Sequence, residues 1–369
     1  MYWTGNTVAT FGGLPWLVAI PVAGLLVFYM ALYVATAASA SGVIVRRFGA
    51  PGLLIVPAAW VSTEYARAHL FGGFPWIPLG NAVVTLLPIA QVASLVGVYG
   101  VSWLLATVNA CFAVAAVTIG RRRLVAVAGA LTLVTVSSVW GAMRLRENHL
   151  TRSGDAIAVG LIQGNVPQDE KWDRDRAREI FDRYLRMSRE AAAAGARFLI
   201  WPESSTPFYF DEAPRNAEEV RQMVRETGAQ LLFGSDEIER GSPDRYYNSA
   251  FILDRVGATA AVYRKIHLVP FGEFVPMESW LTFIGPLIEG VSSFSAGERV
   301  TMLPVDEHMA STAICYEVVY PHLIRDGVRQ GSELLTTITN DAWYGESSAA
   351  YQHFELASMR ARSSIGICG

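Results

Sequence analysis

The sequence predicts two parts, an α-helical transmembrane bundle over residues 1–145 followed by a water-soluble α/β domain over residues 150–369. Hydrophobic residues make up 52% of the chain and charged residues only 17%, whereas charged residues account for about 25% of an ordinary soluble domain. Six arginines and one glutamate are the only charges before position 144, so this part carries +5 and the rest carries −8 of the total −3. Beyond position 150, strand and helix patterns alternate, which is typical of an α/β domain.

Four apolar runs in the first part are predicted to cross a membrane, because about 20 apolar residues span the hydrocarbon core. They occupy residues 16–38, 51–65, 89–119 and 124–140. The second run is short, and Glu64 and Arg67 stand at its end. These two charges are three positions apart and are expected to pair on one helix face, for either a structural or a functional purpose.

Arginines set the expected orientation of these runs. Arg46 and Arg47 lie between the first and second runs, and three more arginines at 121–123 lie between the third and fourth. Because arginine-rich loops stay on the cytoplasmic side, the start of the chain and everything after residue 144 are expected on the outer side. A chain that starts outside without a signal peptide suggests that further helices precede residue 1.

The second part alternates short apolar strands with helices. Strands are predicted at residues 155–163, 197–201, 230–235, 246–254, 259–264, 299–303, 309–314 and 333–339, and helices at 172–194, 216–227, a stretch ending near 329 and another ending near 362. Residues 266–296 contain three prolines and no regular pattern. An irregular stretch of this length in a compact domain is usually functional.

A cysteine ends one of the predicted strands. Cys315 follows the small and β-branched residues 309–314, and Glu317 comes two positions later. A thiol at a strand-to-helix elbow is expected to be exposed and to favour the thiolate near helix N–H groups. The alternative is a buried structural cysteine. Cys111 and Cys368 are too far away in sequence to suggest a zinc knuckle or a disulfide framework.

Two further reactive side chains also follow strands. Glu203 comes after residues 197–201, and Lys265 comes directly after residues 259–264. A carboxylate can take the proton of a thiol, a lysine can stabilise the oxyanion, and the thiolate can hold an acyl group as a thioester. Taken singly, Glu203 could instead cap a loop and Lys265 could be a solvated surface charge.

Four segments around these residues resemble the carbon–nitrogen hydrolase (nitrilase) superfamily and, with the preceding apolar runs, its apolipoprotein N-acyltransferase family. They read LIWPES at 199–204, YRKIHLVPFGEFVP at 263–276, AICYE at 313–317 and TNDAWYG at 339–345. The resemblance implies a four-layer αββα sandwich on the outer side of the bacterial inner membrane, with no cofactor and no metal. It also implies acyl transfer from a phospholipid, typically phosphatidylethanolamine, through a cysteine thioester to the N-terminal amine of a diacylated lipoprotein.

The resemblance also assigns roles to individual residues. Cys315 matches the nucleophile, Glu203 the general base and Lys265 the oxyanion-stabilising lysine. The substrate-binding or supporting positions are Glu273, Tyr316, Glu317 and Trp172. His267 is next but one to the lysine, yet the family does not use this histidine in catalysis.

Two alternative functions remain open from the sequence. One is a membrane-anchored amidase of the same superfamily that hydrolyses a small amide, and the other is a catalytically inactive binding or scaffold module. Several apolar runs argue against a simple anchored amidase, and the intact reactive set argues against an inactive module. The acidic second part gives no support to nucleic-acid binding. Compared with the family, the chain is expected to be incomplete at both ends.

Overall fold

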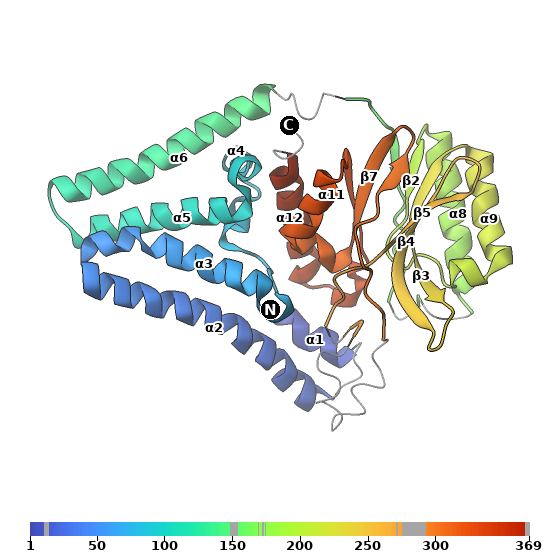
Figure 1. Ribbon diagram of the computed structural model, residues 1–369, viewed down its shortest axis with the longest axis horizontal. Coiled ribbons are helices and arrows are strands. Elements are labelled where there is room, and N and C mark those ends of the chain that lie inside the picture. The colour runs from blue at the N-terminus through green and yellow to red at the C-terminus, as the bar shows by residue number, and fades with distance from the viewer. Residues whose placement is uncertain are drawn as a thin grey trace. The chain divides into compact units, whose positions relative to one another are not determined.

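A computed structural model describes residues 1–10, 15–147, 154–168, 170–171, 173, 175–270, 272–274 and 293–365. The chain divides into two compact units (Figure 1). One is helical and contains residues 20–153 and 351–369, and the other contains residues 2–19 and 154–350. Trp172, Cys368 and most of the irregular stretch 266–296 lie outside the described residues.

Helices of 4 to 33 residues make up the helical unit. They are α2 (Trp16–Phe48), α3 (Val56–His69), α4 (Leu87–Ala90), α5 (Ala93–Val117), α6 (Arg121–Glu147) and most of α12 (Ser348–Ile365). Among the described residues, α2, α5 and α6 are long and apolar enough to cross a membrane. Figure 1 shows α2, α3, α5 and α6 running alternately in opposite directions.

The helix in the second predicted span is, by itself, shorter than the hydrocarbon core is thick. It forms the short 3₁₀ helix η1 (Ala50–Leu54) and the 14-residue helix α3. At a rise of 1.5 Å per residue, α3 is about 21 Å long, whereas the hydrocarbon core is about 30 Å thick. Helix α3 is therefore not among the three helices of the described part of the chain that are by themselves long and apolar enough to cross a membrane, and about four crossings stays a prediction.

Both arginine-bearing turns lie at the same end of the helical unit. Leu53, which follows α2, packs with Val114 near the end of α5 and with Ala126 near the start of α6. The turn after α2 and the turn between α5 and α6 are therefore neighbours, as Figure 1 shows. This arrangement agrees with the expectation that both arginine groups face one side of the membrane.

The second unit is built on two sheets. The five-stranded sheet contains β1 (Val159–Leu161), β2 (Phe198–Ile200), β3 (Gln230–Glu239), β4 (Arg245–Leu253) and β5 (Thr259–Arg264), in that order. The first three strands are parallel, and β4 and β5 are antiparallel to their neighbours. The three-stranded sheet contains β6 (Leu303–Val305), β7 (His308–Ile314) and β8 (Leu334–Ile338), with β7 parallel to β8.

Helices cover the outer faces of the two sheets, giving four layers (Figure 1). Helices α8 (Ala177–Ala193) and α9 (Pro214–Thr227) flank the larger sheet, and α11 (Pro321–Arg329) flanks the smaller one. The core under α8 and α9 contains Trp201, Phe233 and Phe251, each 0% exposed. The predicted fold class, a helical membrane region followed by an αββα sandwich, is confirmed.

Some predicted elements differ in extent. The first strand keeps only three of the residues predicted at 155–163, and β6 begins at Leu303 where residues 299–303 were predicted. A helix that was not predicted, α1 (Trp3–Thr10), belongs with the sheet-containing unit. The ring of Trp3 lies 5.1 Å from that of Tyr344. Aromatic packing of this kind is not visible in a local apolar pattern.

Candidate active site

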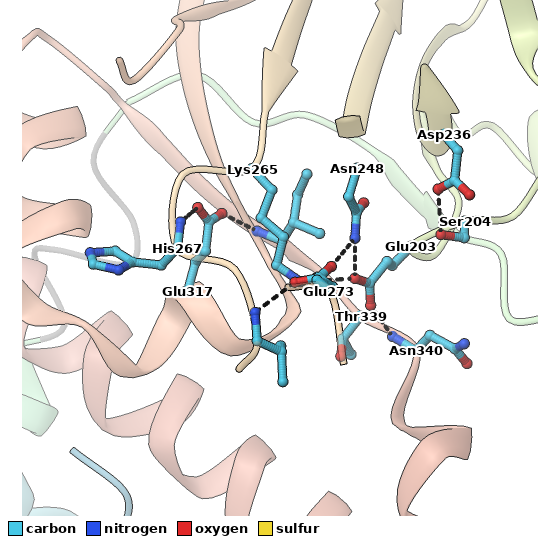
Figure 2. A network of polar contacts seen from close by, with 12 residues as sticks. Glu203, Ser204, Asp236, Asn248, Lys265, His267, Glu273, Glu317, Thr339 and Asn340 are labelled. Carbon is cyan, nitrogen blue, oxygen red and sulfur yellow. Dashed lines mark hydrogen bonds and ion pairs between the residues drawn. The ribbon is translucent and has the colours of Figure 1, made fainter. Parts of the chain in front are cut away.

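Four strand ends bring the predicted residues together. Strands β7 and β8 are parallel and in register at Ile314 and Ile338, so the next residues, Cys315 and Thr339, lie side by side. Glu203 follows β2, and Lys265 follows β5. Figure 2 shows Glu203, Glu273 and Asn248 converging on Lys265.

The backbone at Cys315 is strained. Its φ angle is +52°, which is unusual for a residue with a side chain, and it begins the 3₁₀ helix η7 (Cys315–Val319). A non-glycine residue in this region costs about 1–3 kcal/mol and persists only where its surroundings enforce it. Here the N–H of Ile314 donates to Glu317 Oε2 at 2.8 Å, which fixes the entry to the elbow.

Glu317 supports the elbow from within the protein. Its side chain is 0% exposed. Its Oε1 accepts from the Tyr263 hydroxyl at 2.8 Å, from the Ile266 N–H at 2.7 Å and from the His267 N–H at 3.1 Å. Burial raises the pKa of this carboxyl. Because its contacts tie the elbow to the segment after β5, Glu317 connects the positions of Cys315 and Lys265.

The thiol is buried and protonated at rest. Cys315 is 5% exposed. Burial raises the pKa of its thiol well above the usual value, and the Glu203 charge raises it further, which outweighs the opposite effect of Lys265. The expectation of an exposed thiol that favours the thiolate is therefore wrong. The N–H groups of one short 3₁₀ turn do not offset desolvation and a neighbouring carboxylate.

Lys265 lies between two carboxylates. Its side chain is 1% exposed, and its Nζ lies 2.9 Å from Glu273 Oε1 and 3.2 Å from Glu203 Oε1. Burial alone would lower its pKa, but Glu273 and Glu203 raise the pKa well above the usual value. The ammonium therefore stays charged inside the protein.

Asn248 is a second donor shared by the same two carboxylates. Its Nδ2 donates at 2.8 Å to Glu203 Oε1 and at 2.8 Å to Glu273 Oε1. Although burial would raise the pKa of Glu203, the charge of Lys265, the hydrogen bond from Asn248 and the charge of Lys171 together lower it. Two carboxylates so close together would otherwise tend to share a proton.

A close backbone approach holds Glu203 in place. The other carboxylate oxygen, Oε2, accepts from the Asn340 N–H at 2.9 Å. The Ser205 N–H donates to the Gly234 carbonyl at 2.8 Å, so the turn lies directly on β3. A Cβ at Gly234 would lie 2.6 Å from the Glu203 Cα. Only glycine fits at this position without moving the turn.

Glu273 uses both of its oxygens for contacts within the protein. Oε1 accepts from Asn248 and Lys265, and Oε2 accepts from the Val269 N–H at 2.7 Å. These contacts tie the turn around residue 272 to the lysine. The geometry suits Glu273 to holding Lys265 in place.

Sequence reasoning missed two side chains at the site. Asn248 lies in the buried part of strand β4, and an amide side chain in a buried strand could have been a signal. Lys171 is 8% exposed, and its Nζ donates to the Glu203 carbonyl oxygen at 3.1 Å. Burial lowers the pKa of Lys171, while Glu203, Asp236 and Cys315 oppose this effect. Its position in a turn gave no pattern to recognise.

Tyr316 and His267, which the sequence analysis also named, both pack against the ring of Tyr320. Tyr316 is buried and packs edge-on against Tyr320 at 5.2 Å between ring centroids. His267 stacks on Tyr320 at 4.1 Å, its Nε2 lies 3.2 Å from that of His322, and burial with His322 lowers its pKa to about 4. Figure 2 shows His267 pointing away from the Lys265 cluster.

The four-layer fold and the cysteine, lysine and glutamate at its strand ends define a carbon–nitrogen hydrolase domain. Residues 158–364 match the carbon-nitrogen hydrolase family, and residues 1–111 match the apolipoprotein N-acyltransferase N-terminal domain. The apolipoprotein N-acyltransferase of Geobacter metallireducens is 40% identical over 98% of this chain and 70% of the relative. That of Methylococcus capsulatus is 34% identical over 97% of this chain and 70% of the relative.

The chain therefore belongs to the apolipoprotein N-acyltransferase family. Among solved structures, an amidase from Nesterenkonia sp. AN1 is similar at 18% identity and a TM-score of 0.38, over 50% of this chain and 67% of the amidase. That likeness is too low to support an argument about function. The family assignment removes the reason to prefer an anchored amidase or an inactive module.

Proposed function

We propose that the chain transfers an acyl chain from a membrane phospholipid, phosphatidylethanolamine, through a thioester on Cys315 to the N-terminal amine of a diacylglyceryl-cysteine lipoprotein. The observation that carries the proposal is a buried neutral thiol within electrostatic reach of an ionised Glu203 and a protonated Lys265. A neutral thiol needs a base at the moment of attack, and an ionised carboxylate is that base. The family to which the chain belongs supports the choice of substrates.

The first half-reaction uses all three groups. Glu203 takes the proton from the Cys315 sulfur as the sulfur attacks the ester carbonyl of the phospholipid. The described contacts of Lys265 use two of its three N–H donors, which leaves one for the developing oxyanion. The tetrahedral intermediate collapses, the lysophospholipid leaves as an alcohol with the proton from Glu203, and the acyl group remains on sulfur.

The second half-reaction reverses the proton transfer. Glu203 takes a proton from the lipoprotein amine as the amine attacks the thioester carbonyl, and Lys265 again stabilises the oxyanion. The Cys315 thiolate leaves and recovers its proton from Glu203. An amide bond has then formed on the lipoprotein, and the enzyme has returned to its neutral thiol.

Other residues serve these three. Asn248 and the Asn340 N–H position Glu203, and Glu273 positions Lys265. Glu317 positions the elbow of Cys315. Trp172 and Tyr316 remain proposed contacts of the substrates or supports of the site. No described contact assigns a proton transfer to His267.

Kinetics test the two-step character of the transfer. The donor lipid and the acceptor amine react at the same cysteine in turn. Double-reciprocal plots of initial rate against donor concentration, at several acceptor concentrations, should therefore be parallel lines. Glu203→Gln should slow both half-reactions while leaving the fold intact. Intersecting plots, with no acyl group on the protein when the phospholipid alone is present, would show direct transfer instead.

We also propose that the catalytic unit faces the outer side of the bacterial inner membrane. The shared end of the two arginine-bearing turns supports this orientation. A cysteine introduced at Val256, which is 69% exposed in the catalytic unit, should react with an impermeant thiol reagent added outside the membrane. A cysteine at Arg122 should react only after permeabilisation. The opposite pattern would reverse the orientation.

A further inference from the structure

Helix α1 packs against a loop that helps to hold the catalytic base, although the chemistry described above does not involve this helix. The loop contains the 3₁₀ helix η8 (Asp341–Tyr344), which directly follows Asn340. The Asn340 N–H donates to Glu203 Oε2 at 2.9 Å (Figure 2). A displacement of η8 would therefore move one of the hydrogen-bond donors of Glu203.

Trp3 joins α1 to η8. Its side chain is 5% exposed. Its ring meets the ring of Tyr344 edge-on, with 5.1 Å between the centroids and 70° between the planes. Because aromatic pairs prefer this edge-to-face geometry, the indole of Trp3 restricts where the phenol ring of Tyr344 can lie.

Tyr344 connects this contact to the reacting groups. Burial raises the pKa of its phenol well above the usual value, and the charges of Cys315, Asp341 and Glu203 act in the same direction. Charges have such an effect only over short distances, so the phenol lies close to the nucleophile and the base. Trp3 is therefore separated from the catalytic groups by a single side chain.

Two polar contacts join the same segments. The Thr7 hydroxyl donates to the Trp3 carbonyl oxygen at 3.0 Å and also has the Trp343 carbonyl oxygen within reach at 3.4 Å. The Ser348 N–H donates to the Tyr2 hydroxyl at 3.3 Å. These contacts lie before and after the aromatic pair in the sequence of the loop, so the segment around α1 holds the loop along its length.

A four-residue 3₁₀ helix such as η8 needs outside contacts to fix its position, because the hydrogen bonds within a 3₁₀ helix have poor geometry. At its entry, the Thr339 hydroxyl donates to Asp341 Oδ1 at 2.9 Å, which ties η8 to the end of β8. At its exit, Gly345 has a φ of +55° and changes the chain direction. The contacts from α1 hold this exit end.

We propose that Trp3 and Thr7 of α1 are positioning residues for acyl transfer, which hold η8 so that the Asn340 N–H stays bonded to Glu203. This role rests on the proposed thioester mechanism, in which Glu203 is the base. Both residues act through the loop and not on the reacting atoms. If the loop shifts, an ionised carboxylate loses a donor, which raises its pKa, and the base is held less accurately beside the thiol.

The pH dependence of acylation tests this role. The whole chain is mixed with phosphatidylethanolamine in detergent micelles, and the acyl adduct on Cys315 is followed by mass spectrometry at a series of pH values. In Trp3→Leu the acid midpoint should rise by about one pH unit, and acylation at neutral pH should slow about tenfold, the scale for losing a hydrogen bond to a charged group. Trp3→Phe keeps a ring that can face Tyr344, so it should recover most of both losses.

Phe181→Leu is the matched control. Phe181 is 2% exposed, and its ring meets that of Phe208 edge-on at 5.2 Å. It lies in the core under α8, on the larger sheet, whereas η8 follows β8 of the smaller sheet. Phe181→Leu therefore also removes one ring of a buried edge-to-face pair. It should lower the stability of the catalytic unit and keep the acid midpoint of the original chain.

Alkylation of Cys315 by iodoacetamide separates this proposal from the proposed function. The reaction needs no phospholipid, and the modified peptide is quantified by mass spectrometry. Because the thiol gives its proton to Glu203, the acid limb of alkylation follows the ionisation of that carboxylate. The midpoint should rise in Trp3→Leu as it does for acylation. A rise in alkylation midpoint, with no acyl adduct on the unsubstituted chain, would support the positioning role and contradict the thioester mechanism.

Two results would overturn the positioning role. One is an unchanged acid midpoint in Trp3→Leu, and the other is an equal rise in Phe181→Leu, since either would leave α1 with packing alone. If Trp3→Leu does not fold, Thr7→Val decides the question, because it removes one hydroxyl and keeps the shape of the side chain. A smaller rise in its midpoint would support the proposal, and an unchanged midpoint would overturn it.

Discussion

The two groups of buried charges in this chain differ in how their polar atoms are satisfied. In the catalytic unit, the oxygens of Glu203 and Glu273 are held by Lys265, Asn248 and backbone N–H groups. On α3, Glu64 and Arg67 keep buried atoms without partners in the described part of the chain. The first arrangement is preorganised for chemistry, since its charges are already placed for the transition state. The second lacks such contacts and is not preorganised in this way.

This difference predicts how substitutions behave. Removing a member of the catalytic cluster leaves its partners buried and unpaired, which harms both reaction rate and stability. Removing a charge from α3 deletes atoms that already lack partners in the described part of the chain, so stability should change less.

The largest effect is expected for Lys265→Ala. Acylation of Cys315 should slow on the order of 10²–10³-fold, the scale for losing one oxyanion donor. The free energy of unfolding should also fall by about 3–5 kcal/mol, because two buried carboxylates lose their shared cation. Lys265→Arg should recover the charge but not the rate, since a planar guanidinium cannot replace a compact ammonium. Single-turnover acylation and denaturant unfolding measure the two quantities, and near-normal turnover in either variant would remove the lysine from the mechanism.

A smaller effect, with a clear pH signature, is expected for Asn248→Ala. The Asn248 hydrogen bond lowers the pKa of Glu203, so its loss should raise that pKa. Because Glu203 acts as a base only when ionised, the acid limb of the pH–rate profile should move to higher pH, and the rate at neutral pH should fall about tenfold.

Ser249→Ala is the matched control for that substitution. The Ser249 hydroxyl donates to Glu237 Oε2 at 2.8 Å, and among the described residues it makes no hydrogen bond to Glu203 or Glu273. The Ser249→Ala variant removes a partly buried hydrogen bond made by the next residue of the same strand. If the two variants share one pH midpoint, Asn248 has only a structural role.

The smallest effect is expected for His267→Gln. Burial and His322 lower the pKa of His267 to about 4, below the value of about 6.5 for an unfolded histidine. The neutral ring therefore contributes stability that is complete above about pH 6.5 and is lost as the pH falls toward 4. The variant should show a flatter loss of stability across that window, with turnover within about twofold of the original. A large loss of turnover at neutral pH would place the histidine in the reaction.

The sequence predicted the reactive residues because each follows an apolar strand, and strand ends meet in a layered domain. The prediction of Glu203, Lys265 and Cys315 as site residues did not require the distances between them to be known. Asn248 was missed because its role depends on Glu203 and Glu273, which come from other segments of the chain, lying beside β4. The protonation of Cys315 was predicted wrongly because desolvation depends on the whole surrounding structure. For the same reason, spacing alone suggested a pair between Glu64 and Arg67 that the packed helices do not form.

Intact-mass analysis of the purified chain after mixing with phosphatidylethanolamine alone tests the central claim most directly. The neutral thiol, ionised Glu203 and protonated Lys265 predict one added acyl mass on Cys315, which disappears when a diacylated lipopeptide is added. The adduct should be absent from Cys315→Ala and form slowly in Glu203→Gln. No adduct on the unsubstituted chain, while full turnover proceeds with both substrates present, would contradict the thioester mechanism.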